Sequence, residues 1–154
     1  MTDFIKIKKW PAEHAQDAYD AGYYIEAIQT LHGWIEIKLR EFLLLQRIES
    51  KTETQDLNFG KAWDMTNELS LNQIAKSLFV SGALPEGTLN EILSFNRVRN
   101  NITHKLFHDP YENEYLGIPK AEYDKAFHDG VNLGYIIENM SEDKISNPSF
   151  KRDA

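Results

Sequence analysis

Apolar residues recur every three or four positions along much of the chain, which is the spacing of one face of a helix. The clearest run lies in segment 11–50, where the apolar positions at this spacing are Ile28, Leu31, Ile35, Leu39 and Phe42. Pro11 suits the first turn of a helix, and Gly22 and Gly33 are points at which so long a helix would divide or bend. The pattern therefore predicts a long helical segment, either continuous or interrupted at a glycine.

After a polar loop at 50–58, the same periodicity predicts further helices. They cover 59–82, as two short helices or one bent helix that ends at Gly82, and then 88–110 and 120–140. Pro110 has no backbone N–H and must end the helix close to it. We expect residues 111–119 to form a connector and residues 141–154 to form a polar, mobile tail.

No segment alternates with period two for long enough to predict a strand. We therefore predict an all-α fold, a helical bundle of four to five helices with two of them long. The 154 residues match one domain, 1–154, with a core of about 12–140. That length is sufficient to bury a hydrophobic core without disulfides or a structural metal.

The chain contains no cysteine, which excludes disulfides, zinc–thiolate sites and cysteine nucleophiles. This composition fits the reducing cytoplasm, where we expect the protein. No apolar run approaches the roughly 20 residues of a membrane span, and the basic start lacks the apolar stretch of a signal peptide. We therefore expect no membrane partner. The net charge of -7 argues against bulk binding to a nucleic-acid backbone, although a local basic patch remains compatible with it.

One stretch carries unusual chemistry, "FNRVRNNITHKLFHDP" at residues 95–110. On a helical wheel, Phe95, Ile102 and Leu106 fall on one stripe. Opposite it, between about 140° and 240°, lie Arg97, Asn100, Asn101, His104 and His108. A solvated helix face is the competing interpretation. Solvated faces are usually built from Glu, Lys and Gln, because Asn and His are poorer helix formers, so we treat this stripe as a candidate functional surface.

Arg99 lies about 40° from Phe95, at the margin of the apolar stripe. A guanidinium there must either extend outward to water or find a carboxylate. Glu36 and Glu41 in the first long segment are the expected partners, although Glu36 would equally suit an ordinary surface position.

The segment "RNNITH", with Arg99 followed by Asn100 and then by His104, resembles the motif of HEPN domains (higher eukaryotes and prokaryotes nucleotide-binding). That motif is an arginine, often followed by a polar residue, and a histidine after a gap of four to six residues. Arg99 gives a gap of four and Arg97 a gap of six, so either arginine fits. Segment 21–43 also resembles the opening helix of the family, and the resemblance covers about residues 12–140.

The resemblance implies a metal-independent endoribonuclease without a cofactor, often a toxin of a toxin–antitoxin or phage-defence system. It implies an RNA substrate, a homodimer whose two motifs face one cleft, and an antitoxin protein as a possible partner. One branch of the family, paired with nucleotidyltransferase antitoxins, carries a tyrosine where this chain has Leu106, so we do not expect membership of that branch. Other members lack activity and bind nucleotides or act as scaffolds.

The candidate residues suit RNA cleavage by attack of the 2′-hydroxyl on the adjacent phosphate. Histidine serves as a general base or acid near neutrality, and arginine stabilises the charge that develops on phosphate oxygens. We expect Arg99, Asn100 and His104 to be catalytic, with Asn100 orienting the histidine or binding phosphate. The residues expected to assist RNA binding are Arg97, Asn101 and His108.

Other interpretations stay open. His104 and His108 have a spacing that can hold a metal, but no acidic residue shares their face, so we expect no metal site. The acidic charge favours a non-catalytic HEPN-like module that binds nucleotide, RNA or a protein, and a plain helical interaction domain is a third possibility. Further residues given structural or solvated roles are His14, His32, His128, the aromatics Tyr19, Tyr23, Tyr24 and Trp34, and the basic arm Lys6, Lys8 and Lys9.

Overall fold

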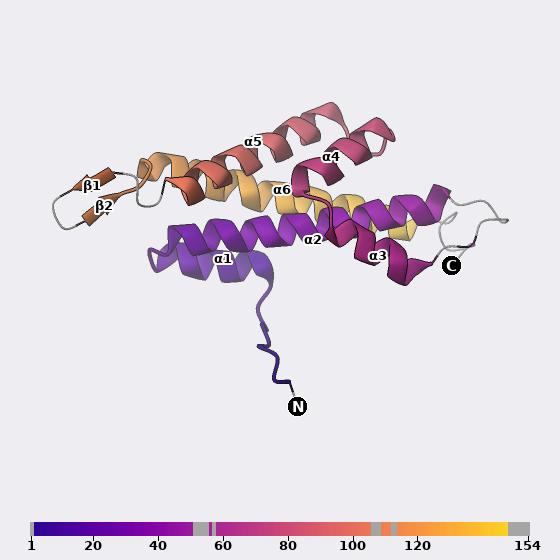
Figure 1. The fold of residues 1–154 in the computed structure, drawn as a ribbon, viewed down its shortest axis with the longest axis horizontal. Helices are drawn as coiled ribbons and strands as arrows, with labels where there is room; N and C mark the ends of the chain where they lie inside the picture. The colour runs from indigo at the N-terminus through magenta and orange to yellow at the C-terminus, as the bar shows by residue number, and fades with distance from the viewer. Residues whose placement is uncertain (1, 51–55, 57, 106–108, 112–113, 148–154) are drawn as a thin grey trace.

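The computed structural model describes residues 2–50, 56, 58–105, 109–111 and 114–147. This part of the chain is a helical bundle, as predicted, with six helices rather than four or five (Figure 1). The helices are α1 (Pro11–Asp20), α2 (Tyr24–Ser50), α3 (Phe59–Asn67), α4 (Leu71–Val80), α5 (Glu86–His104) and α6 (Lys120–Ser146). A short hairpin of β1 (Asp109–Tyr111) and β2 (Glu114–Leu116) lies between α5 and α6.

The first predicted segment divides at Gly22 and not at Gly33. Gly22 has a φ of 85°, a left-handed conformation that glycine adopts without strain, and it separates α1 from α2. Gly33 lies inside α2, which continues for 27 residues without a break. This division accounts for one of the additional helices.

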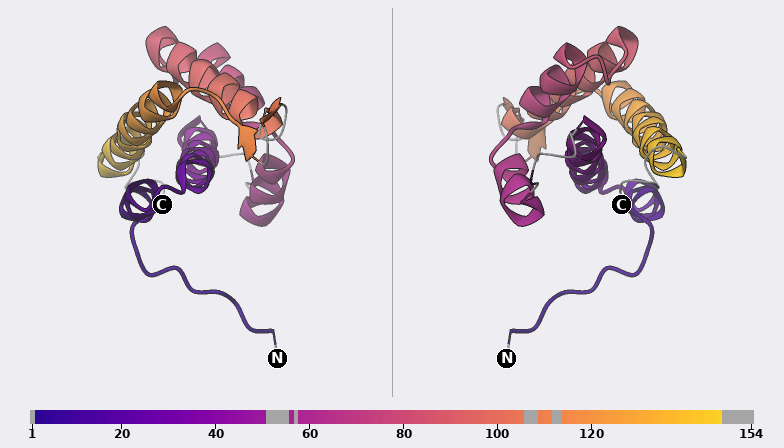
Figure 2. Two further views of the ribbon diagram at one scale, coloured as in Figure 1. Left: turned by 90° about the vertical axis from the view of Figure 1, so that its left-hand side faces the viewer. Right: turned by 90° about the vertical axis from the view of Figure 1, so that its right-hand side faces the viewer.

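Helix α2 is the centre of the bundle, and all five other helices contact it (Figure 2). Viewed along its axis, α2 lies between α1 and α3, with α5 and α6 covering its remaining sides. The apolar face predicted from the sequence is the buried face, and its residues Ile28, Leu31, Ile35, Leu39 and Phe42 are each at most 3% exposed. Burial of this face is the main source of the core.

Two glycines of α6 allow it to approach its neighbours closely. A Cβ atom on Gly130 would lie 2.7 Å from Cε2 of Phe95 and 3.0 Å from Cδ1 of Leu31. A Cβ atom on Gly134 would overlap the ring of Trp34. Since Gly130 and Gly134 are four residues apart, they form one smooth face on which side chains of α2 and α5 pack.

The segment 59–82 forms two helices because Ser70 starts a new one. Its side chain accepts a hydrogen bond from the backbone N–H of Gln73, and the Gln73 side chain accepts one from the N–H of Ser70. This capping box satisfies two backbone donors that α4 would otherwise leave unpaired. Gly82, with a φ of 77°, follows the end of α4 as expected.

The last third of the chain differs from the prediction in three places. Helix α5 ends at His104, earlier than the predicted end near Pro110. The predicted connector contains part of the antiparallel hairpin, in which Asp109 pairs with Leu116; three residues per strand are too few for alternation to reveal them. Helix α6 continues to Ser146, and Ser141 is 4% exposed, so the predicted tail from 141 is helical up to that point.

The glycine contacts of α6 generate a stability prediction. We expect Gly134→Ala to lower the free energy of unfolding by about 1–3 kcal/mol, because the added methyl group overlaps Trp34. We expect the control Gly33→Ala, at an exposed helical position with no atom within 4 Å, to raise it by about 0.5–1 kcal/mol. Urea unfolding followed by circular dichroism measures both, and equal effects at the two sites would contradict the packing described here.

Candidate functional site

The polar residues of α5 face two directions. Arg97, Asn101 and His104 are exposed and form one stripe, which we call the α5 stripe. Arg99 is half-buried and points toward α2, since its direction differs from that of His104 by about 140°. Arg97 and His104 differ by only about 20° and are separated by two helical turns, about 10 Å along the axis. Arg97, rather than Arg99, therefore shares the face of His104.

The Arg99 guanidinium is fixed by two side-chain amides. Its Nε donates a hydrogen bond of 3.1 Å to Oε1 of Gln29 on α2, and its Nη1 donates one of 2.8 Å to Oδ1 of Asn100. Gln29 is itself held, because its Nε2 donates to Oγ1 of Thr103 at 3.1 Å. The arginine thus has a defined position between α2 and α5, and Asn100 orients this arginine and not His104.

The prediction that Glu36 or Glu41 pairs with Arg99 is wrong. Glu36 accepts a hydrogen bond of 2.7 Å from Arg40, and Glu41 accepts one of 2.9 Å from Lys38. Both pairs lie within α2 at spacings that bring side chains together on a helix. Glu36 also lies about 10 Å further along α2 than Gln29, which is the residue level with Arg99.

A second polar group surrounds His32, which is 8% exposed. Its Nε2 lies 3.2 Å from Oδ1 of Asn96 on α5, and Nδ2 of Asn96 donates to Oδ1 of Asn72 on α4 at 3.0 Å. Because Asn96 uses its amide N–H on Asn72, its oxygen accepts from His32, which assigns the ring proton to Nε2. The Nδ1 atom of His32 lies 3.7 Å from Oε2 of Glu36.

Burial lowers the pKa of His32 below its ordinary value of 6.5, and the positive charge of Arg99 lowers it further, against the opposing effects of Glu36 and Asn96. The imidazole is therefore neutral at pH 7. The Arg99 and His32 groups are electrostatically coupled, and we call them together the α2–α5 seam. Its residues are Gln29, His32, Asn72, Asn96, Arg99, Asn100 and Thr103.

Sequence reasoning gave His32 a structural role and missed its partners. A signal was present, since His32 occupies the same face of α2 as Ile28 and Ile35, where a buried polar group requires a partner. The partner Asn96 is 64 residues away, next to Phe95, and it shares the buried side of α5. Nothing in the local pattern pairs the two.

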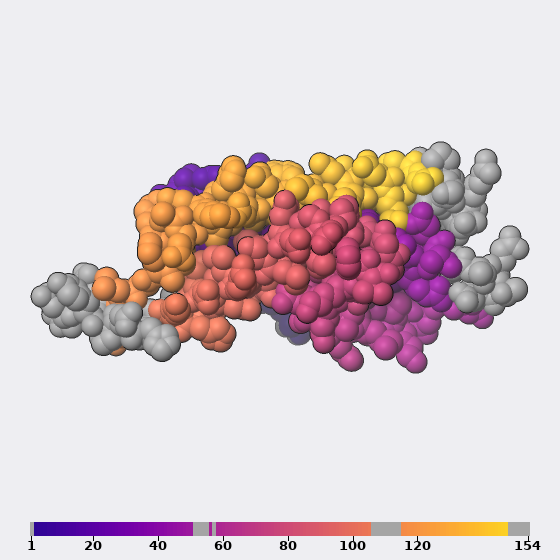
Figure 3. Space-filling view, turned by 90° about the horizontal axis from the view of Figure 1, so that it is seen from above, coloured from indigo at the N-terminus to yellow at the C-terminus, as the bar shows by residue number. Residues whose placement is uncertain are grey.

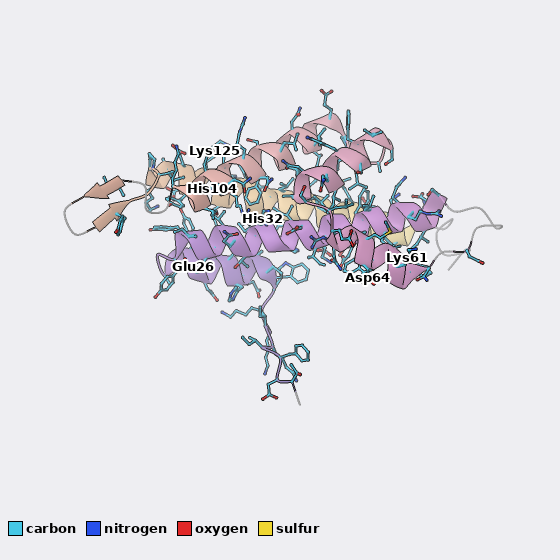
Figure 4. The ribbon with its side chains drawn as sticks, viewed as in Figure 1. Glu26, His32, Lys61, Asp64, His104 and Lys125 are labelled. Atoms are coloured by element: carbon cyan, nitrogen blue, oxygen red, sulfur yellow. The ribbon has the colours of Figure 1, made fainter. Side chains whose placement is uncertain are left out.

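The structure brings some of the predicted site residues together and not others. Arg99 and Asn100 are in contact, whereas no hydrogen bond joins either to His104 among the positions the structure describes. Arg97, Asn101 and His104 point to solvent, and His104 lies toward the hairpin end of α5, while His32 lies between α2 and α5 (Figure 4). His108 lies outside the described residues.

Within the described ranges, no group of three His, Asp or Glu side chains is arranged to hold a metal ion. The helices in those ranges are also too short or too polar to cross a bilayer. No family model matches the chain, and neither a curated protein nor a solved structure matches it. The resemblance to HEPN domains therefore rests on the residues quoted above.

The burial of His32 predicts a pH dependence of stability. The unfolded chain binds a proton at His32 near pH 6.5, whereas the folded chain does so only at lower pH. The free energy of unfolding should therefore fall as the pH decreases from about 6.5 toward 5, and His32→Gln should reduce this slope. Urea unfolding at several pH values tests it against the control His14→Gln, at an exposed position of α1. If the free energy of unfolding depended on pH equally in His32→Gln and His14→Gln, the lowered pKa of His32 would be contradicted.

Proposed function

We propose that this protein is a metal-independent endoribonuclease of the HEPN type, acting as a toxin or in phage defence. The observation that carries the proposal is the α5 stripe. His104 and Arg97 are exposed on one face of α5, with no partner in the part of the chain that the structure describes. A histidine buried in the core would have argued against catalysis, whereas an exposed one is free to meet a substrate.

The reaction needs three functions around one phosphate. A base removes the proton of the 2′-hydroxyl, the 2′-oxygen forms a bond to phosphorus, and the bond to the 5′-oxygen breaks as an acid protonates that oxygen. Histidine fits the base and acid roles, and arginine fits the charge on the phosphate oxygens. Each chain offers one His104, so we propose a homodimer in which two copies of His104 supply both proton transfers.

The two arginines would have different tasks in this site. Arg97 is exposed and shares the face of His104, so it is the arginine we assign to the scissile phosphate. Arg99 is held by Gln29 and Asn100 and raises the positive potential near α5 without leaving its position. Asn101 would contact the RNA beside them. An antitoxin protein that covers the α5 stripe would block the site.

A non-catalytic module that binds nucleotide, RNA or a protein is the alternative. It is favoured by the net charge of -7, since an RNA enzyme profits from positive potential. It is also favoured by Arg99, which already donates hydrogen bonds to two amides of its own chain. The two functions differ in whether RNA is cut.

Cleavage of a mixed RNA pool in the presence of EDTA tests the proposal. We expect wild-type protein to cut, and His104→Ala to reduce the rate by about 100-fold or more, because proton transfer by histidine contributes at least that factor. The matched control His14→Ala, also exposed, should cut at the wild-type rate. Circular dichroism confirms that each variant is folded. Full activity of folded His104→Ala would refute the catalytic role, and absence of cutting by any protein would favour the binding module.

Arginine substitutions separate catalysis from structure. Arg97→Gln should reduce cleavage by about 100-fold, the effect of losing one oxyanion donor, and leave stability unchanged because Arg97 is exposed. Arg99→Gln should lower the free energy of unfolding by about 1–3 kcal/mol, since it leaves Gln29 and Asn100 without their charged donor. Loss of cleavage with Arg99→Gln and none with Arg97→Gln would reverse the assignment of the two arginines.

A further inference from the structure

The N-terminal arm, residues 2–8, carries large apolar side chains that are mostly exposed. Phe4 is 80% exposed, Ile5 95% and Ile7 71%. The arm has neither helix nor strand and extends away from the bundle (Figure 1). Three large apolar side chains gathered within four residues are unfavourable in water, and such clusters commonly mark a contact surface.

The arm is anchored at its base and free beyond it. Lys9 forms an ion pair with Asp17 of α1, and the ring of Trp10 packs edge-on against Trp34 with 5.8 Å between centroids. Beyond these anchors, Lys6 and Lys8 have no partner in the described residues. In an extended chain, Ile5 and Ile7 point to one side and Lys6 and Lys8 to the other.

A groove lies between α5 and α6, on the face of the molecule shown in Figure 3. It consists of a cavity of about 700 Å³ and an adjoining one of about 210 Å³, which share Ser94, Lys125 and Asp129. Its apolar residues include Val98, Leu133 and Ile136. We call this hollow the α5–α6 groove.

The charged side chains that line the α5–α6 groove leave it acidic. Lys125 and Asp129 form an ion pair with each other and contribute no net charge. Glu91 and Glu122 have no hydrogen-bond or ion-pair partner among the residues that the structure describes. The groove therefore offers two free carboxylates, the same number as the free ammonium groups at Lys6 and Lys8.

We propose that the α5–α6 groove of each molecule holds the N-terminal arm of a second copy of this chain. The seven residues of the arm span about 23 Å when extended, and the groove runs from Glu122 to Ile136 of α6, about 21 Å along the helix. Ile5 and Ile7 lie on the apolar floor, and Lys6 and Lys8 reach Glu91 and Glu122 at its edges.

A second copy fits better than the same chain because of where the arm leaves the bundle. The arm departs below α1 and α2, on the side away from α5 (Figure 2). Folding back would require it to reverse direction at Lys9 and Trp10, which α1 and α2 hold in place. Reciprocal exchange of two arms gives a closed two-fold dimer. The groove contains none of Arg97, Asn101 or His104, so the inference is independent of the ribonuclease chemistry.

Disulfide cross-linking in the full-length chain tests whether the arm of one copy lies in the groove of another. The chain has no natural cysteine, so only the introduced cysteines can react. Single variants Ile7→Cys and Asn132→Cys, mixed in equal amounts and oxidised, should give a disulfide-linked species of twice the chain mass. In the control mixture, Val80→Cys takes the place of Asn132→Cys. Val80 is 85% exposed on α4, outside the groove, so this mixture should give no disulfide-linked species above background. Equal cross-linking of both mixtures, or of neither, would overturn the proposal. So would a double variant, Ile7→Cys with Asn132→Cys, that closes only within one chain.

Charge reversal with rescue tests the same contact through the mass of the assembly in solution. Sedimentation should find wild-type dimers, and Lys6→Glu with Lys8→Glu should weaken dimerisation by at least about tenfold, because two attractions become repulsions. Mixing that variant with Glu91→Lys, Glu122→Lys protein should restore association through both contacts, because the reversed arm meets the reversed groove and the unchanged arm meets the unchanged groove. Monomeric wild-type protein, or dimers that the arm variant leaves unchanged, would overturn the proposal. An arm dimer that cuts no RNA would leave this inference standing while the proposed function fails.

Discussion

The burial of α2 on nearly every side is the constraint on which the rest of the structure depends. A helix that packs against five others buries much of its surface, so a polar side chain on a buried side of it requires a partner. Gln29 and His32 meet side chains of α5, and Arg40 donates through Nε to the backbone oxygen of Thr66 at the end of α3, at 3.1 Å. The polar positions of α2 therefore help to fix how α3 and α5 are placed around it.

As a result, helix α5 has three faces with different roles. One side belongs to the α2–α5 seam, one lines the α5–α6 groove, and the third is the exposed α5 stripe. The seam restrains Arg99 and keeps His32 neutral, so the helix that carries the stripe is held firmly against the core. A rigid helix is a suitable support for a site that must meet a phosphate with defined geometry.

The charged side chains of this acidic chain are distributed unevenly over its surfaces. Glu36 and Glu41 of α2 pair with cations of the same helix, whereas Glu91 and Glu122 along the groove have no partner among the described residues. Lys6 and Lys8 of the N-terminal arm and Arg97 of the α5 stripe likewise have no partner among the residues that the structure describes. The two surfaces proposed to bind partners thus differ in sign, the stripe being basic and the groove acidic, and this separation lets one molecule use both at once.

The sequence by itself determined the fold class, the helical segments and the buried face of α2. These follow from residues three and four positions apart, such as Ile28, Leu31 and Ile35, whose spacing acts within one helix. It also separated Arg97 and His104 from the apolar side of α5, because rotation per residue is constant along a helix.

Only the tertiary structure decided which of the two glycines breaks the first segment and which residues meet Arg99 and His32. Gly22 and Gly33 are chemically identical, and the packing of α1 on α2 selects the left-handed conformation at the first. The contacts Gln29–Arg99 and His32–Asn96 join residues 70 and 64 positions apart. Such pairs depend on how far one helix is shifted along another, and that shift is set by the packing of whole faces and leaves no trace in local periodicity.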